Sequence, residues 1–183
     1  MNQIKIFAPA SVANVSCGFD VLGFCLEPVG DQMLIRKTNS SGIKITKIEG
    51  QNLPLDVKKN VAGVAAEALL KAHPTKSGFE IEIFKNIKAG SGIGSSAASA
   101  AGAVYGINEL LGKPFTSHDL ISFAMEGEGM ASGTVHADNV APVLMGGITL
   151  VRSIDPVDVI KLPIPKALTA VVLHPKIELK TMH

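Results

Sequence analysis

The chain has 183 residues, of which 17 are basic and 16 acidic, so its formal net charge is +1. This length predicts one domain or slightly more. The balanced charge argues against nucleic acid as a partner, because nucleic-acid binding needs a basic surface. Hydrophobic residues make up 46% of the chain, which excludes a disordered protein. Charged residues make up only 18%, so we expect a partner subunit or further sequence to cover part of the surface.

The sequence gives no sign of export or membrane insertion. Its N-terminus lacks the charged and apolar regions of a signal peptide. The uncharged stretch at 89–108 is mostly glycine, serine and alanine, which predicts a loop and a buried helix rather than a membrane span. Cys17 and Cys25 lie eight residues apart without a CxxC pattern, and free thiols suit a reducing compartment. We therefore expect a cytoplasmic protein that does not associate with a membrane.

The first half of the chain is predicted to form strands, one long loop and one helix. Alternation of apolar residues, as at Ile4 and Ile6, marks the strands, and Asn60 is a suitable N-cap for the helix. In chain order we expect a strand at 3–8, a loop at 9–23, strands at 21–26 and 32–37 around a turn at 28–31, a strand at 42–48, a helix at 60–73 and a half-exposed strand at 79–84.

The second half of the chain is predicted to be mainly helical before it returns to strands. Thr116 and Asp119 have the spacing of a capping box, which marks the start of one helix. In chain order we expect a loop at 85–94, helices at 95–111, 116–130 and 137–144, and strands at 148–152, 157–162 and 168–173. Strands and helices are interspersed without regular βαβ alternation, so the predicted fold class is α+β, with a mainly antiparallel or mixed sheet packed with helices.

The strongest local signal is a glycine-rich run between a predicted strand and a predicted helix. Gly90, Gly92 and Gly94 occupy alternate positions, where they let backbone amides approach a ligand closely. Ser95 and Ser96 open the helix, whose free amides and dipole favour an anion such as a triphosphate. The other interpretation is a flexible loop before a closely packed helix. The run matches neither a Walker A loop nor a dinucleotide or protein-kinase glycine motif.

Three segments resemble the homoserine kinases of the GHMP kinase superfamily. Residues 92–99 are similar to the phosphate loop of that superfamily, residues 9–23 to the first homoserine kinase motif, and residues 127–147 to its H-x-D-N segment. Their order and spacing fit across the whole chain. Ser16 and Cys17 stand where the family often has Gly-Pro, Ile93 stands where leucine is usual, and a proline near the start of the loop is missing.

The resemblance implies a domain organisation. It predicts that residues 1–165 form the GHMP kinase N-terminal, ATP-binding domain, with a ribosomal protein S5 domain 2-like fold. Family members are longer and have a second domain, so residues 166–183 are predicted to be the start of a truncated C-terminal domain. The family's substrate arginines belong to that second part, and Arg36 and Arg152 lie in none of the motifs. We therefore expect the chain alone to bind nucleotide better than homoserine and to have little or no activity.

The resemblance also implies roles for residues around the substrate and a metal ion. Asn14, Asp20, His136 and Asn139 would bind homoserine, with Asp20 facing its ammonium group. Local Asx turns and a structural histidine are the alternatives. Ser96 and Glu128 would hold Mg²⁺, with Glu126 as the competing carboxylate. Asp138 neighbours the position of the base in other GHMP kinases, but no catalytic base is assigned.

The nucleotide contacts implied by the resemblance fall on one helix start and on the glycine-rich run. Asn60 would contact the adenine or ribose, although an ordinary N-cap has the same sequence signature, and a solvated lysine is the alternative at Lys88. The predicted nucleotide-binding residues are Asn60, Lys88, Ala89, Gly90, Ser91, Gly92, Ile93, Gly94, Ser95, Ser96, Ala97 and Ala98.

The function that the resemblance implies is phosphorylation of the hydroxyl of L-homoserine by ATP and Mg²⁺, a step of threonine biosynthesis. The family also implies a homodimer. Two alternatives stay open at this point: a GHMP kinase for another hydroxyl substrate, such as mevalonate or a sugar, and a non-catalytic nucleotide-binding relative.

Overall fold

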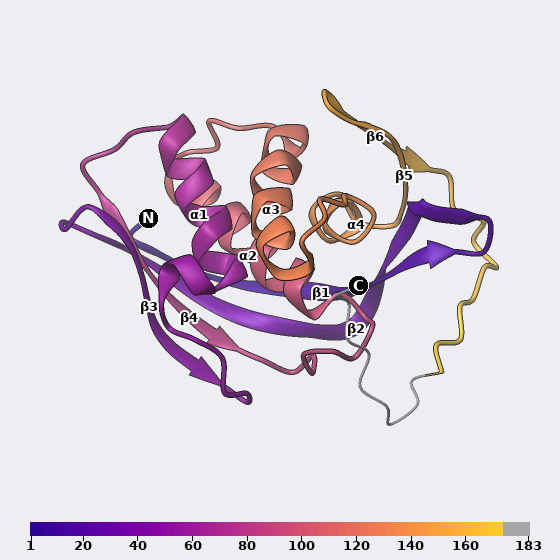
Figure 1. Cartoon of the computed structure of the whole chain (residues 1–183), viewed down its shortest axis with the longest axis horizontal. Helices are drawn as coiled ribbons and strands as arrows, with labels where there is room; N and C mark the ends of the chain where they lie inside the picture. Colours follow the sequence, from indigo (N-terminus) through magenta and orange to yellow (C-terminus); the bar gives the residue numbers. More distant parts are fainter. Residues whose placement is uncertain (174–183) are drawn as a thin grey trace.

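A computed structural model describes residues 1–173 of the chain, and in it one mixed sheet carries a layer of helices on one face (Figure 1). The strands are β1 (Gln3–Val15), β2 (Gly18–Thr38), β3 (Gly42–Glu49), β4 (Gly78–Phe84), β5 (Ile148–Ile154) and β6 (Val157–Leu162). The helices are the short 3₁₀ helix η1 (Val57–Lys59), α1 (Val61–Ala72), α2 (Ser95–Leu110), α3 (Ser117–Ser132) and α4 (Val140–Met145).

The long strand β2 organises the sheet, whose order is β3-β4-β2-β5-β6 with β1 paired along β2. The pairing of β3 with β4 is parallel, and the other pairings are antiparallel. The predicted α+β class with a mainly antiparallel, mixed sheet is therefore confirmed. β2 pairs with β4 over residues 32–38 and with β5 over residues 22–24. This division leaves space between β4 and β5, and the loop after β4 lies next to it.

The prediction for the first thirty residues was wrong in two places. Residues 9–23 do not form a loop, because β1 continues to Val15 and β2 begins at Gly18. Small side chains do not prevent a backbone from pairing, and here they form the end of a long hairpin. The predicted turn at 28–31 is a bulge inside β2: Pro9 pairs with Gly30 and the next residue, Ala10, pairs with Leu26.

The C-terminal prediction also needs correction. Residues 168–173 form no strand, and within the described part of the chain no strand lies beside them to supply the hydrogen bonds that a strand needs. The predicted second unit at 166–183 falls largely on residues 174–183, which lie outside the described residues, so the predicted boundary stays a prediction.

Helix α2 packs closely against the sheet because its residues are small. Gly102 faces Met33 and Gly106 faces Ile35, and a β-carbon at either glycine would lie 2.5 Å from the facing side chain. The alanines of α2 are buried between the sheet and the neighbouring helices α1 and α3. This contact fixes the N-terminus of α2 with respect to β2, which matters because the glycine-rich run leads into it. In the described part of the chain, no helix is both long and apolar enough to cross a membrane.

Candidate functional site

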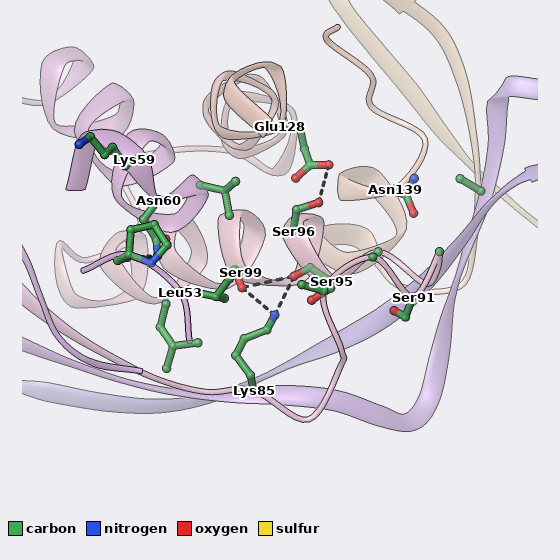
Figure 2. Close-up of a pocket in the computed structure, with 18 of the residues that line it drawn as sticks. Leu53, Lys59, Asn60, Lys85, Ser91, Ser95, Ser96, Ser99, Glu128 and Asn139 are labelled. Atoms are coloured by element: carbon green, nitrogen blue, oxygen red, sulfur yellow. Dashed lines mark hydrogen bonds between the residues drawn. The ribbon is translucent and has the colours of Figure 1, made fainter. Parts of the chain in front are cut away.

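A pocket of about 510 Å³ lies at the N-terminus of α2 (Figure 2). One wall is the glycine loop, which we define as residues 85–94, together with the first turn of α2. Leu53, Pro54 and the start of α1 form a second, largely apolar wall. The C-terminal part of α3 and the hairpin between β1 and β2 complete it. Segments that are far apart in the sequence thus meet around one cavity.

The glycine loop bends through left-handed backbone conformations. Gly90, Gly92 and Gly94 have φ angles of 71°, 75° and 68°, which side chains other than glycine rarely adopt. Gly94 is the N-cap of α2 and makes no side-chain capping bond. The hydroxyl of Ser91 is buried in the pocket wall and has no hydrogen-bond partner among the described residues. The amides at the start of α2, which have no partner within the helix, and an unpartnered hydroxyl suit an anionic ligand such as a phosphate.

Hydrogen bonds hold the loop in this shape. The side chain of Gln51 donates to the carbonyl of Ile87 and accepts from the amide of Ala89, both at 2.7 Å. Ser95 Oγ donates to the same carbonyl at 2.8 Å, and the amide of Ser11 donates to the carbonyl of Ile93 at 3.2 Å. The loop is therefore fixed to the segment after β3, to β1 and to its own helix.

The two predicted metal ligands face each other across the pocket. Ser96 Oγ donates a hydrogen bond to Glu128 Oε2 at 3.1 Å (Figure 2). Burial raises the pKa of the Glu128 carboxyl, while the bond from Ser96 and the charges of His136 and Lys85 lower it. Glu126, the competing carboxylate, is exposed and lies outside the pocket.

These two oxygen ligands fit a Mg²⁺ ion, which keeps few protein ligands and binds largely through water and phosphate oxygens. Among the described residues, no group of three or more His, Cys, Asp or Glu side chains is arranged to hold a metal ion. A metal at this site would therefore depend on a phosphate ligand for its remaining contacts.

The predicted substrate residues gather beside the pocket, at the hairpin tip and before α4. Asn14 and Asn139 line the pocket, and Asp20 and His136 form an ion pair, with Oδ1 and Nδ1 3.4 Å apart. Asn14 Oδ1 accepts from the amide of Asp20 at 2.8 Å, which is the local turn that the sequence left as an alternative. Asn139 Oδ1 accepts from Ser11 Oγ, also at 2.8 Å. The structure thus brings all four residues together, but it uses both asparagine oxygens internally.

Asp138 lies next to this group and is buried. Burial raises the pKa of its carboxyl and Asp20 raises it further, whereas His136 lowers it. Its Oδ1 atom has no hydrogen-bond partner among the described residues. The charge of His136 thus lowers the pKa of both Glu128 and Asp138, and its ring contacts Asp20.

Some predicted nucleotide residues lie in the pocket and others do not. Asn60 lines it and also caps α1, because its Oδ1 accepts from the amide of Ala62 at 3.0 Å. Lys88 is exposed and is not part of the pocket wall, and its contact with nucleotide stays a prediction. Ala97 and Ala98 are buried in the core, and Ile93 packs against a second small core cluster.

Two lysines that line the pocket, Lys59 and Lys85, are not among the residues predicted from the sequence. Lys59 precedes the N-cap of α1. Lys85 directly follows β4 and is buried, where it forms an ion pair with Asp31. The sequence could have predicted that Lys85 points inward, because it continues the alternation of Phe79, Ile81 and Ile83.

Comparisons with known proteins agree with this architecture. Residues 58–147 match the family described as GHMP kinases N terminal domain. The chain is 44% identical to a homoserine kinase of Chloroherpeton thalassium and 40% identical to one of Methanococcus vannielii, over 100% and 99% of its length. It covers 61% and 60% of those two proteins, so it spans about three fifths of the length of the curated relatives it matches.

Solved structures give the same result. The crystal structure of homoserine kinase from Cytophaga hutchinsonii superposes with a TM-score of 0.84 at 52% identity, covering 90% of this chain and 53% of that one. A mevalonate kinase of Methanococcus jannaschii, at 17% identity, shares the fold with a TM-score of 0.67 over 88% of this chain and 56% of its own. By sequence and by fold, the chain is similar to homoserine kinases, and its residues 58–147 match the N-terminal domain of the GHMP kinases.

Proposed function

We propose that the protein transfers the terminal phosphoryl group of ATP to the hydroxyl of L-homoserine. One observation carries the proposal: a glycine loop at a helix N-terminus and a Ser–Glu pair suited to Mg²⁺ line the same pocket, and a polar group that includes the Asp20 carboxylate lies beside it. Each is a part that phosphoryl transfer to an amino-acid hydroxyl requires. The names of the relatives support the same substrate.

The nucleotide would lie between the two walls of the pocket. Leu53, Pro54 and Val61 offer apolar surface for the adenine, with Asn60 beside them. The phosphates would then reach the glycine loop, where backbone amides and the Ser91 hydroxyl supply donors without side-chain bulk. Because these donors are already in place, little reorganisation is needed as charge shifts in the transition state.

Ser96 and Glu128 would hold Mg²⁺. When bound, Mg²⁺ neutralises negative charge on the phosphates. Ser96 is the second residue of α2, so the packing of that helix on the sheet determines where its hydroxyl lies. Glu128 comes from α3 and approaches from the opposite side. The site therefore depends on the contact between these two helices.

The homoserine would lie near the hairpin tip. The carboxylate of Asp20 suits an ammonium group, and Asn14 and Asn139 present polar atoms on the same side of the pocket. These residues would orient the hydroxyl toward the phosphates, which is the main requirement of a loose transition state. No base is assigned to Asp138.

Several finer properties belong to the same proposal. We infer that the phosphoryl donor is ATP, that the metal is Mg²⁺ and that the reaction serves threonine biosynthesis in the cytoplasm. A homodimer is also proposed, on the family resemblance alone.

A substrate panel tests the proposal. The purified full-length protein is incubated with MgATP and with homoserine, mevalonate or galactose, and ADP release is measured for each. We expect homoserine to give the highest kcat/KM. A higher value for mevalonate or galactose, or nucleotide binding without metal-dependent turnover of any of the three, would overturn it.

A further inference from the structure

A buried ion pair lies directly under the glycine loop. Asp31 is in β2, next to the bulge where the strand changes partners, and Lys85 is the first residue after β4. Their side chains are 0% and 1% exposed. The ammonium of Lys85 contacts Asp31 Oδ2. It also donates to the carbonyl of Ser95 at 2.8 Å and to Ser99 Oγ at 3.0 Å (Figure 2).

The second oxygen of Asp31 holds the other end of the loop. Asp31 Oδ1 accepts from the amide of Asn86 at 2.7 Å and from the amide of Ile87 at 2.9 Å. One carboxylate therefore fixes the amides of the second and third residues of the glycine loop directly. Through Lys85 it also fixes the first carbonyl of α2. The loop residues that follow, 88–94, run between these two anchored ends and are held in addition by Gln51 and by the amide of Ser11.

The contacts of Lys85 exclude an ordinary phosphate-binding role. An ammonium group has three N–H donors, and the three contacts of Lys85 in the described structure are Asp31, Ser95 and Ser99. All three donors are therefore in use. Although Lys85 lines the pocket, its charge is neutralised by Asp31 and further balanced by Glu128.

Stability alone does not account for the pair. A buried ion pair is often no more stabilising than apolar side chains of the same size, because both charges must leave water. Unlike two apolar residues, the pair can bind backbone groups at both ends of the seven-residue segment 88–94. A loop held in its binding conformation loses less entropy when a ligand binds.

We propose that Asp31 and Lys85 are positioning residues that preform the glycine loop for the phosphates of the nucleotide. This proposal rests on the proposed function, because it assumes that the loop binds phosphates. It assigns to two residues outside the sequence motifs a role in nucleotide affinity, exerted through the backbone of the loop and not by contact with the ligand.

Three variants test it: Asp31→Asn, Lys85→Met and the double variant. Each single variant leaves one buried charge without its partner, so each should melt at a lower temperature. The double variant removes both charges and keeps an oxygen for the loop amides, so its Tm should return close to that of the unsubstituted protein. It should nevertheless bind the ATP analogue adenylyl imidodiphosphate, with Mg²⁺, about tenfold more weakly, because the tie to Ser95 is lost.

The Arg36–Glu82 ion pair supplies a matched control. It joins the same two strands, β2 and β4, but is partly exposed and lies outside the pocket. Glu82→Gln should leave nucleotide affinity unchanged. In steady-state assays, the double variant should raise the KM for ATP and leave the KM for homoserine unchanged, a split that a general loss of folding would not give.

The experiment distinguishes a positioning role of the ion pair from a purely structural one. A double variant that regains both Tm and nucleotide affinity would show that the pair is only structural and would overturn the proposal. Unchanged affinity in a folded single variant would do the same. If the unsubstituted protein fails to bind the analogue, the proposed function itself has failed, and this arm of the experiment reveals it independently.

Discussion

The glycine-loop end of the pocket is buried and bonded to the sheet, whereas the hairpin-tip end is exposed and bonded mainly to itself. At the loop end, the side chains of Asp31 and Lys85 are almost inaccessible to solvent, and their polar atoms are satisfied by each other, by backbone groups and by Ser99 Oγ. At the hairpin tip, the side chains of Asp20 and His136 are 50% and 40% exposed. Buried hydrogen bonds in a low-dielectric site hold geometry more firmly than exposed ones.

This difference indicates that the two ligands meet different kinds of site. The phosphates would enter a shape that already exists, whereas the amino acid would have to immobilise exposed side chains as it binds. Ordering such side chains costs about 0.5–1.5 kcal/mol each. Substitutions at the loop end should therefore change nucleotide affinity or turnover, and those at the hairpin tip should change the KM for homoserine.

The largest effect is expected where the two ends meet, at Glu128. Glu128→Gln removes the carboxylate that would hold Mg²⁺, so we expect kcat to fall by about a hundredfold or more, with a higher Mg²⁺ requirement. Glu126→Gln is the matched control, since Glu126 is an exposed carboxylate on the same helix. If Glu126→Gln causes the loss and Glu128→Gln does not, the assignment of the metal ligand is wrong.

Gly92 tests whether the loop end depends on its shape. At φ 75°, Gly92→Val would strain the loop and place a branched side chain among the amides that face the phosphates. We expect nucleotide binding, measured by calorimetry, to be lost. Gly112→Val is the control, because Gly112 has a φ of 88° and open space around it, so it carries a similar strain away from the pocket. Equal nucleotide affinity in the two folded variants would contradict the prediction.

Asp20 tests the hairpin-tip end. Asp20 has a φ of 58°, a left-handed conformation that asparagine tolerates well, so Asp20→Asn should keep the backbone and the bond from its amide to Asn14. Loss of a charge-assisted hydrogen bond should raise the KM for homoserine about tenfold to a hundredfold, with the KM for ATP unchanged. Glu67→Gln, which removes an exposed carboxylate of α1, should change neither constant. An equal rise in both KM values would mean that the two ends do not act independently.

Much of the fold could be predicted because its patterns have simple physical causes. The N-cap at Asn60 and the capping box at Thr116 and Asp119 are confirmed, and so is the alternation that forms β4. The hairpin at 9–23 could not be predicted from its side chains. Its strands are rich in alanine, serine, glycine and valine, and their pairing depends on long-range backbone contacts that leave no periodic signal in the sequence.

Site residues that lie in recognisable motifs could be predicted from the sequence. Charged residues at inward-facing strand positions were not predicted. Glu128 was preferred over Glu126, and the structure places Glu128 in the pocket. Asp31 was taken as part of a turn, but it shares the inward face of β2 with Met33 and Ile35. A carboxylate at an inward strand position needs a partner. Lys85 holds the corresponding inward-facing position directly after β4. An ion pair between these two charged residues could therefore have been predicted from the sequence alone.

The smallest expected effect concerns Asp138, between the two ends. Burial raises the pKa of its carboxyl in the folded protein, so the folded state holds this proton more tightly than the unfolded state does. The contribution of the protonated Asp138 carboxyl to the stability of the folded state is therefore complete below the unfolded pKa and is lost as the pH rises through the raised folded pKa.

Asp138→Asn removes this titration, so the Tm of the variant minus the Tm of the unsubstituted protein should increase with pH across that range and then level off. Melting curves at several pH values measure it, with Glu67→Gln, at an exposed carboxylate of α1, as the control. A difference in Tm that stays constant or decreases with rising pH would mean that His136 stabilises the charged form of Asp138 enough to cancel the effect of burial.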